Sequence, residues 1–122
     1  MNSGESEEHV VADKLYLGID AVEVSQPLAM GAFNQLQFNV WIESASTSLG
    51  VNSVVVQVQT SLDMDTWSTV SSLSVTLNSA PKSGTDGSAG ATDPVPGPYV
   101  RLLYSGGGAA VLLGASIRLF HA

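Results

Sequence analysis

Residue types that carry out catalysis are few in this chain and lie far apart. The sequence has no cysteine and two histidines, His9 and His121, near opposite ends of its 122 residues. A serine nucleophile needs a histidine base beside it, and chain ends seldom hold such a pair in place. Two terminal histidines are also a poor ligand set for zinc. We therefore expect no enzyme, no metal site and no bound cofactor.

Two carboxylates, Asp63 and Asp65, stand two positions apart in the segment SLDMDTW. Oxygen ligands at this spacing suit calcium, but Met64 and Trp67 interrupt the series of oxygens that a complete loop supplies. Aspartates also bond their own backbone two residues on, so we favour a hairpin turn capped by them. The glycines at 106–108 follow a strand without the lysine and helix of a phosphate loop, which predicts a second hairpin turn.

The aromatic residues are the remaining candidates for contact with a partner. In LQFNVWIE, residues 36–43, apolar side chains occupy one phase and Trp41 shares the other with polar ones. An aromatic ring on a polar face suits stacking on a sugar or docking on a protein. The alternative is that a second layer, such as the N-terminal segment, covers it. Phe120, in the outward phase of the last strand, is a further candidate, and Trp67 is expected in the core.

These residues must be positioned by strands. Val54, Val56 and Val58 alternate with mostly polar neighbours before the aspartate turn, and β-branched residues fill both arms. Such runs recur between turn signals, and no segment keeps a helical period over three turns. The sequence therefore predicts an all-β, jelly-roll-like antiparallel β-sandwich of about seven or eight strands. Segments 44–53 and 79–98 read as irregular loops.

Length and composition limit the organisation of the chain. A protein of 122 residues forms one domain, which we place at residues 14–122. Residues 1–13 are polar and acidic, and we expect either a disordered tail or an arm that orders against a neighbouring subunit through Glu5, Glu7 and Glu8. The same acidic start lacks the basic and apolar parts of a signal peptide, so we expect assembly in the cytoplasm.

The charge balance excludes several classes of partner. Eleven acidic residues against four basic ones give a formal net charge of −7. Nucleic acids and anionic membranes need clustered cations, and the four basic residues here are scattered along the sequence. The longest apolar run, GAAVLLGASI, is also too short to span a bilayer. We expect no nucleic-acid partner and no membrane partner.

The segments VVVQVQTSLDMDTW and PYVRLLYSGGGAAVLLGASIRLF together resemble small β-sandwich proteins of tailed-phage virions. The residues that carry this resemblance are Ser61, Asp63, Trp67, Tyr99, Val100 and Arg101. The resemblance extends over most of the chain from about residue 15, because SQPLAMGAFNQLQFNVWIE fits the early strands of that family. It implies a structural role, such as a decoration protein on a capsid or a minor part of a tail.

The same strand, turn and tryptophan pattern is similar to galactose-binding-like (discoidin) sandwiches. That resemblance implies a carbohydrate-binding module with its ligand, a surface glycan, in loops 44–53 and 79–98. We favour the virion protein: a homo-oligomeric capsid decoration or stabilising subunit that contacts its own copies and a major capsid or other virion protein. On this hypothesis, deletion of residues 1–13 leaves the domain folded but weakens assembly, and Val56→Asp prevents folding.

Overall fold

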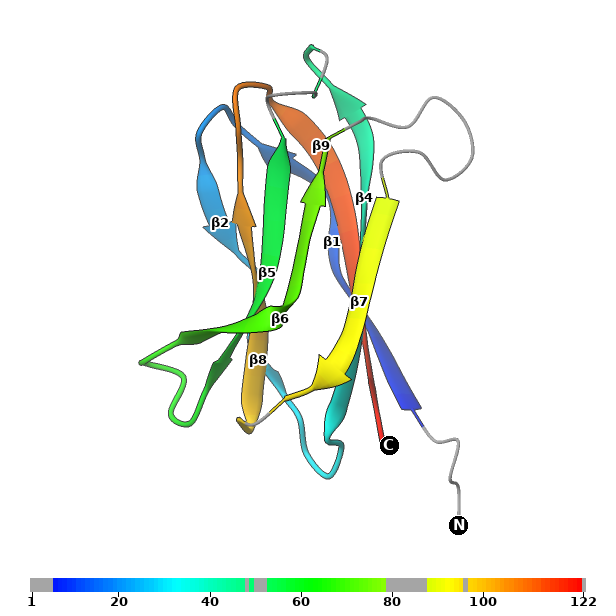
Figure 1. The fold of residues 1–122 in the computed structure, drawn as a ribbon, viewed down its shortest axis with the longest axis vertical. Coiled ribbons are helices and arrows are strands. Elements are labelled where there is room, and N and C mark those ends of the chain that lie inside the picture. Colours follow the sequence, from blue (N-terminus) through cyan, green and yellow to red (C-terminus); the bar gives the residue numbers. More distant parts are fainter. Residues whose placement is uncertain (1–5, 48, 50–52, 79–87, 96, 122) are drawn as a thin grey trace.

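A computed structural model describes residues 6–47, 49, 53–78, 88–95 and 97–121, and all of these are strand, turn or loop. The strands are β1 (Ser6–Leu17), β2 (Val22–Val24), β3 (Leu28–Ala29), β4 (Gln35–Ala45), β5 (Val54–Ser61), β6 (Ser68–Leu77), β7 (Ser88–Pro94), β8 (Tyr99–Ser105) and β9 (Val111–Phe120). Figure 1 shows them as two facing layers. None of the described residues forms a helix long and apolar enough to cross a membrane.

The two layers are antiparallel sheets with a defined strand order. The four-stranded sheet has the order β1-β9-β4-β7, and the five-stranded sheet has β2-β8-β5-β6 with β3 also paired to β8. Most consecutive strands therefore lie in opposite sheets. The exceptions are β2 and β3, which share an edge, and the hairpin β5–β6 at the centre of the chain. This alternation between two sheets is the topology of a jelly roll. The predicted all-β sandwich is confirmed.

Strands β2 and β3 are two pieces of one edge strand. β2 pairs with Leu103–Ser105 and β3 with Tyr99–Val100, so both lie along the same edge of β8. Ser25 continues the ladder between them, because its backbone N–H donates to the Leu102 carbonyl and its Oγ accepts from the Leu102 N–H. Pro27 has no N–H and interrupts the strand. Counted this way the described residues form eight strand positions, as the alternation predicted.

The core lies between the sheets and follows the predicted alternation closely. On β4, β5 and β8 every second residue is buried, and on β9 one full phase is buried. Val56 is fully buried, as the sequence analysis required of a core position. The register of β5 against β6 jumps between Gln57 and Val58, which are paired with Ser74 and Val70. A β-bulge of β6 therefore lies between Val70 and Ser74.

The acidic N-terminal segment is not a tail outside the domain. Strand β1 begins at Ser6, and its residues 6–10 pair residue by residue with β9. The domain boundary expected at residue 14 is therefore wrong for residues 6–13, and residues 1–5 lie outside the described range. The segment reads as polar because an edge strand with one solvent face needs few apolar side chains.

The long segment 79–98 also differs from the prediction of an irregular loop. Its residues Ser88–Pro94 form β7, which pairs with β4 from Gln35 to Trp41. The sequence did not predict this strand, because its small and polar residues show no alternation of apolar and polar side chains. Of the expected loop at 44–53, residues 44 and 45 extend β4, and several others lie outside the described residues.

The three glycines at 106–108 do not form a hairpin turn, because β8 and β9 lie in different sheets. Among the described residues the one glycine with a positive φ is Gly31, so left-handed backbone is not the reason for the triplet. Close approach is the reason at Gly106, where a Cβ would stand 2.6 Å from the carbonyl oxygen of Gly18. The Gly106 N–H donates to the Ala21 carbonyl at 2.7 Å, which joins this crossover to the β1–β2 turn.

Candidate binding face around Trp41

Trp41 lies on the outer face of the four-stranded sheet, as its phase in β4 predicted. Its neighbours along the strand, Val40 and Ile42, are fully buried on the opposite face, and Trp41 itself is partly exposed. Its cross-strand partner on β9 is Gly114. The described part of the N-terminal segment, from Ser6 on, does not lie over it, because β1 is in the same sheet, on the far side of β9.

The indole of Trp41 lies directly against the backbone at Gly114. A Cβ built at Gly114 would stand 2.4–2.5 Å from Cε2, Cζ2 and Nε1 of the indole, far inside contact distance. Glycine is therefore needed at this position so that the ring can settle on β9. We call this arrangement, the indole of Trp41 lying on Gly114, the Trp41 platform.

Both strands beside Gly114 are irregular at this level of the sheet. The register of β1 against β9 shifts between Val10 and Ala12 and again between Ala12 and Leu15, while β4 shifts between Ile42 and Ser44. Lys14, inside the β1 irregularity, has a φ of 53°, which a non-glycine residue rarely adopts. Bulges re-aim side chains and are frequent beside functional sites.

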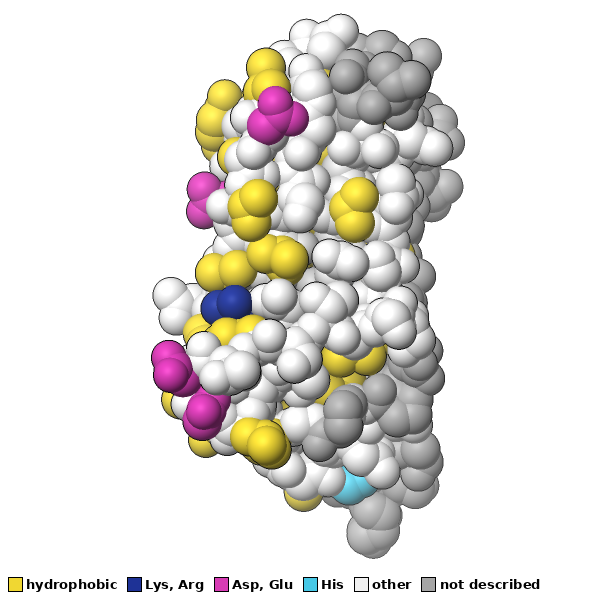
Figure 2. Space-filling model, turned by 60° about the vertical axis from the view of Figure 1, so that its left-hand side comes forward, with side chains coloured by type: hydrophobic (Ala, Val, Ile, Leu, Met, Phe, Trp, Pro, Cys, Tyr) yellow, Lys and Arg dark blue, Asp and Glu magenta, His cyan; other side chains and the backbone are white. Residues whose placement is uncertain are grey.

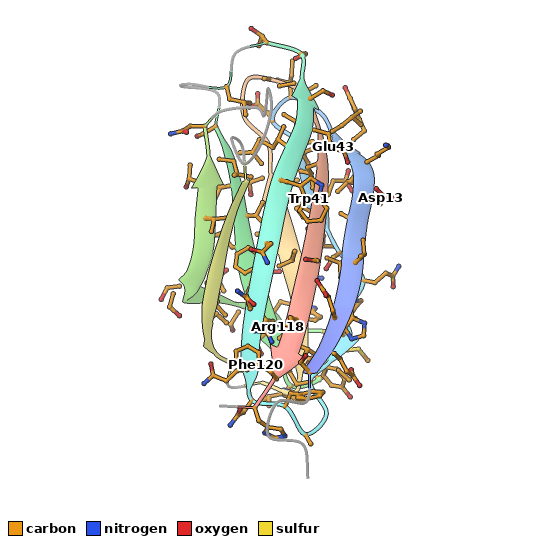
Figure 3. The ribbon with its side chains drawn as sticks, turned by 90° about the vertical axis from the view of Figure 1, so that its right-hand side faces the viewer. Asp13, Trp41, Glu43, Arg118 and Phe120 are labelled. Atoms are coloured by element: carbon orange, nitrogen blue, oxygen red, sulfur yellow. The ribbon has the colours of Figure 1, made fainter. Side chains whose placement is uncertain are left out.

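These irregularities bring charged side chains to the same end of the sheet as Trp41. Asp13 and Lys14 come from the β1 bulge and Glu43 from the β4 bulge. The Lys14 ammonium lies 3.7 Å from a Glu43 carboxylate oxygen, so this ion pair crosses over β9. Figure 3 shows Asp13, Trp41 and Glu43 toward one end of the face, with Arg118 and Phe120 toward the other.

At the far end of this face, Phe120 is covered by a cation. The Arg118 guanidinium lies 4.6 Å from the Phe120 ring centroid, and its Nε donates to Gln37 Oε1 at 3.1 Å. Of the predicted acidic contacts, Glu8 is paired across the strands with Arg118, and the His9 ring nitrogen lies 3.3 Å from a Glu7 carboxylate oxygen. Glu5 lies outside the described residues.

The outer face of the five-stranded sheet carries the other tryptophan. Trp67 is partly exposed and absent from the buried core, so its predicted core position is wrong. The Arg101 guanidinium stacks on its ring at 4.2 Å from the centroid, and Arg101 Nε donates to Gln59 Oε1 at 2.9 Å. The alternation along the sequence predicted the wrong face for Trp67, because the turn before β6 changes the side of the sheet on which this residue lies.

The aspartate turn is closed by its own hydrogen bonds, as predicted. Asp63 Oδ1 accepts from the backbone N–H groups of Asp65 and Thr66 at 2.9 and 3.0 Å and from the Ser61 hydroxyl at 3.0 Å. These bonds, that from Thr66 first, hold the pKa of Asp63 below its ordinary value. The described residues contain no group of three or more His, Cys, Asp or Glu side chains that could hold a metal ion. A hollow of about 330 Å³ lies beside this turn, lined by Leu62 and Gly97 among others.

A third feature is an exposed apolar edge. Among the described residues, seven large hydrophobic side chains are exposed, and five of them come from β1, β2 and the turn between them. We call these five residues the apolar edge: Val10, Tyr16, Ile19, Val22 and Val24. Figure 2, which views the side of the five-stranded sheet, shows hydrophobic side chains in several exposed groups with few charged ones between them.

No protein-family model matches this sequence, and no curated protein matches it. Solved structures do share its fold. The PBSX exported protein XepA is similar with a TM-score of 0.70 and 11% identity, over 98% of this chain and 38% of that protein. The VP2 subviral particle of infectious bursal disease virus gives 0.56 and 12%, over 96% and 32%.

Tripeptidyl peptidase 2 gives a TM-score of 0.63 and 8% identity, over 95% of this chain and 10% of that protein. The chain thus spans well under half the length of each of these three proteins. At such low identity the likeness concerns the fold alone, and function must be argued from the surface.

Proposed function

We propose that this chain is a non-enzymatic structural protein of a virus particle, most specifically a capsid decoration or stabilising subunit assembled in the host cytoplasm. It binds other copies of itself and a major capsid or other virion protein through its surfaces. The observation that carries this proposal is the apolar edge.

The apolar edge is unusual for a surface that faces water only. Its five side chains are between 46% and 68% exposed, and all of them come from one stretch of fifteen residues. Large apolar side chains that remain exposed in number on one part of a surface mark interaction sites. Each square ångström of apolar surface removed from water contributes roughly 25 cal/mol, so burying these side chains against a partner favours association. A stable contact of this kind covers about 800 Å² on each partner.

The turn within the apolar edge is held rigidly. The Asp20 N–H donates to the Gly107 carbonyl at 2.8 Å, and the Gly106 N–H donates to the Ala21 carbonyl at 2.7 Å. Asp20 adopts a φ of 57°, which these bonds fix. Because the turn is already ordered, presenting Ile19 to a partner costs little conformational entropy.

The fold adds support of a general kind. Jelly rolls are frequent in viral capsid domains and also occur in lectins. A likeness to a subviral particle is compatible with the proposal, but the same fold serves many functions. The galactose-binding alternative places its ligand in loops 44–53 and 79–98, and Ser88–Pro94 of the second segment form a strand.

The test compares two substitutions that each introduce a carboxylate. For each variant, and for the natural chain, the number of copies in purified virus particles is measured. Val22→Asp places a carboxylate in the apolar edge, whereas Leu62→Asp places one on a more exposed apolar residue in the β5–β6 turn. We expect Val22→Asp to reduce the copy number per particle, measured by quantitative mass spectrometry, and Leu62→Asp to leave it unchanged. Equal occupancy of both variants, or absence of the natural chain from particles, would contradict the proposal.

A further inference from the structure

The four-stranded sheet carries a built feature that assembly through the apolar edge does not use. Three irregular features surround Trp41. They are Gly114 in β9, the bulges in β1 and β4 on either side of it, and Lys14 with its positive φ. A glycine within a strand often marks a place where something approaches the backbone closely. Here the indole fills that place and turns one of its faces outward.

We propose that the Trp41 platform binds a pyranose ring of a neutral glycan with equatorial hydroxyl groups. Such a ring has axial C–H bonds on its faces, and these pack against the flat indole while the hydroxyls project from the ring's edge. This site lies on a sheet face and is independent of the proposed assembly role.

Trp41 differs from the other outward aromatic rings in what covers it. Trp67 is stacked with Arg101 and Phe120 with Arg118. Among the described residues no guanidinium or ammonium group is stacked on Trp41. Within the described part of the chain, the cation that occupies the other two rings thus has no counterpart on Trp41.

The polar groups around the platform suit a polyol and disfavour an anion. Asp13 and Glu43 offer carboxylate acceptors, and Lys14 offers an ammonium donor that already lies 3.7 Å from Glu43. Asn39, two residues before Trp41 on the same face, is exposed and supplies both a donor and an acceptor. Together Asp13, Lys14 and Glu43 carry a net charge of −1, which disfavours an anionic ligand. Sugar hydroxyls both donate and accept, so they can use all of these groups.

The face is long enough for an oligosaccharide. From Trp41 to Gln35, β4 extends by six residues, or roughly 20 Å at the usual rise per residue. The outward positions along this stretch are polar, with Asn39, Gln37 and Gln35 on β4. A chain of several sugar units stacked at one end by Trp41 could therefore lie along the strand.

The experiment uses Trp41 as its own reporter. In the variant Trp67→Phe, Trp41 is the one remaining tryptophan, and its emission is followed while cellohexaose or chitohexaose is added. We expect a saturable change with one or both sugars. Calorimetry should then show that Trp41→Ala lowers the affinity for the sugar by about tenfold or more, as for loss of an aromatic anchor. The affinity of Trp67→Ala should be unchanged.

Two further variants keep the test informative if Trp41→Ala is poorly folded. Gly114→Ala displaces the indole from β9 and should weaken binding, whereas Asn39→Ala removes one exposed polar partner and should weaken it less. Equal affinity in Trp41→Ala and the natural chain would overturn the proposal, as would the absence of saturable binding of either sugar. Salt-sensitive binding of decalysine in place of the sugars would also overturn it and assign the face to a basic protein partner.

Discussion

Each outer face of the sandwich carries the same arrangement of an arginine, a glutamine and an aromatic ring. On the five-stranded sheet Arg101 bonds Gln59 and stacks on Trp67, and on the four-stranded sheet Arg118 bonds Gln37 and stacks on Phe120. In both places a strand next to the sheet centre is fastened to its neighbour by a guanidinium that is held between an amide and a ring.

Trp41 does not follow this arrangement. It lies on a glycine instead of under an arginine, and the strands around it are bulged. The difference between Trp67 and Trp41 shows that an outward aromatic residue is not by itself evidence of a binding site. Trp67 serves the stability of the sheet, because Arg101 occupies its ring, and Trp41 is the ring for which we propose a ligand.

The largest change to both faces is expected from Val56→Asp, which removes the core that supports them. Val56 is fully buried, and an unpaired charge there should cost about 4–5 kcal/mol or more of unfolding free energy. Urea unfolding followed by tryptophan emission measures this. We expect no cooperative transition, with Trp41 and Trp67 both exposed. A soluble variant with a cooperative transition would show that the two faces do not share this core.

Deletion of residues 1–13 should affect the four-stranded sheet first. It removes more than half of β1 and uncovers the edge of β9. The loss of stability should exceed the roughly 1 kcal/mol of an average substitution, and the bare edge should promote aggregation. Thermal unfolding and light scattering measure the two effects. Unchanged stability would restore the view that this segment is only an arm.

Gly114→Ala should separate the two tryptophans. Alanine is normally favoured over glycine in a strand by roughly 0.5–1 kcal/mol, but here its Cβ would meet the indole. We expect a loss of about 1–3 kcal/mol, as in other overpacked sites. In a Trp41→Ala background the same change should become neutral or stabilising. Equal effects in the two backgrounds, measured by urea unfolding in a double-mutant cycle, would contradict the platform geometry.

Arg101→Met should disturb Trp67 and leave Trp41 unchanged. A cation–π contact at a partly exposed site contributes about 0.5–1 kcal/mol. We expect a loss of this order together with a change in Trp67 emission in a Trp41→Phe background. Arg118→Met is the matched control, because it removes the corresponding contact to Phe120 without touching either tryptophan. If both arginine variants altered Trp67 emission equally, the stacked pair would not be the cause.

The smallest effect concerns pH and the aspartate turn. The pKa of Asp63 is lowered by hydrogen bonds in the folded state, so its contribution to stability is present at neutral pH. That contribution is lost as the pH falls below the ordinary value of 3.8. Asp63→Asn should therefore be less stable than the natural chain at pH 7, and the difference should shrink in acid. A difference that is constant from pH 7 to pH 2 would exclude this linkage.

Much of the sandwich was predictable because alternation reports directly on burial. The strands at β4, β5, β8 and β9 carry strong two-residue periods, and their buried faces agree with those periods. The first part of β1, residues 6–13, and the strand β7 were missed since their residues are mostly polar or small. For such strands pairing with a neighbour, not hydrophobic pattern, decides the structure.

The candidate site was predictable only in part. The outward phase of Trp41 followed from its strand, but its contact with Gly114 depends on the register of β4 against β9. The bulges that bring Asp13, Lys14 and Glu43 to the same level depend on register too. Register between strands that are more than seventy residues apart leaves no local signal, and so the glycine in β9 looked unremarkable in the sequence.

The most direct test of the assembly role is the mass of the purified natural chain in solution. Light scattering after size exclusion, across a range of concentrations, should give a discrete multiple of the 12.6 kDa chain mass. The variant Val22→Asp should give the mass of one chain. A natural chain that stays monomeric at every concentration and binds no virion component would contradict the account.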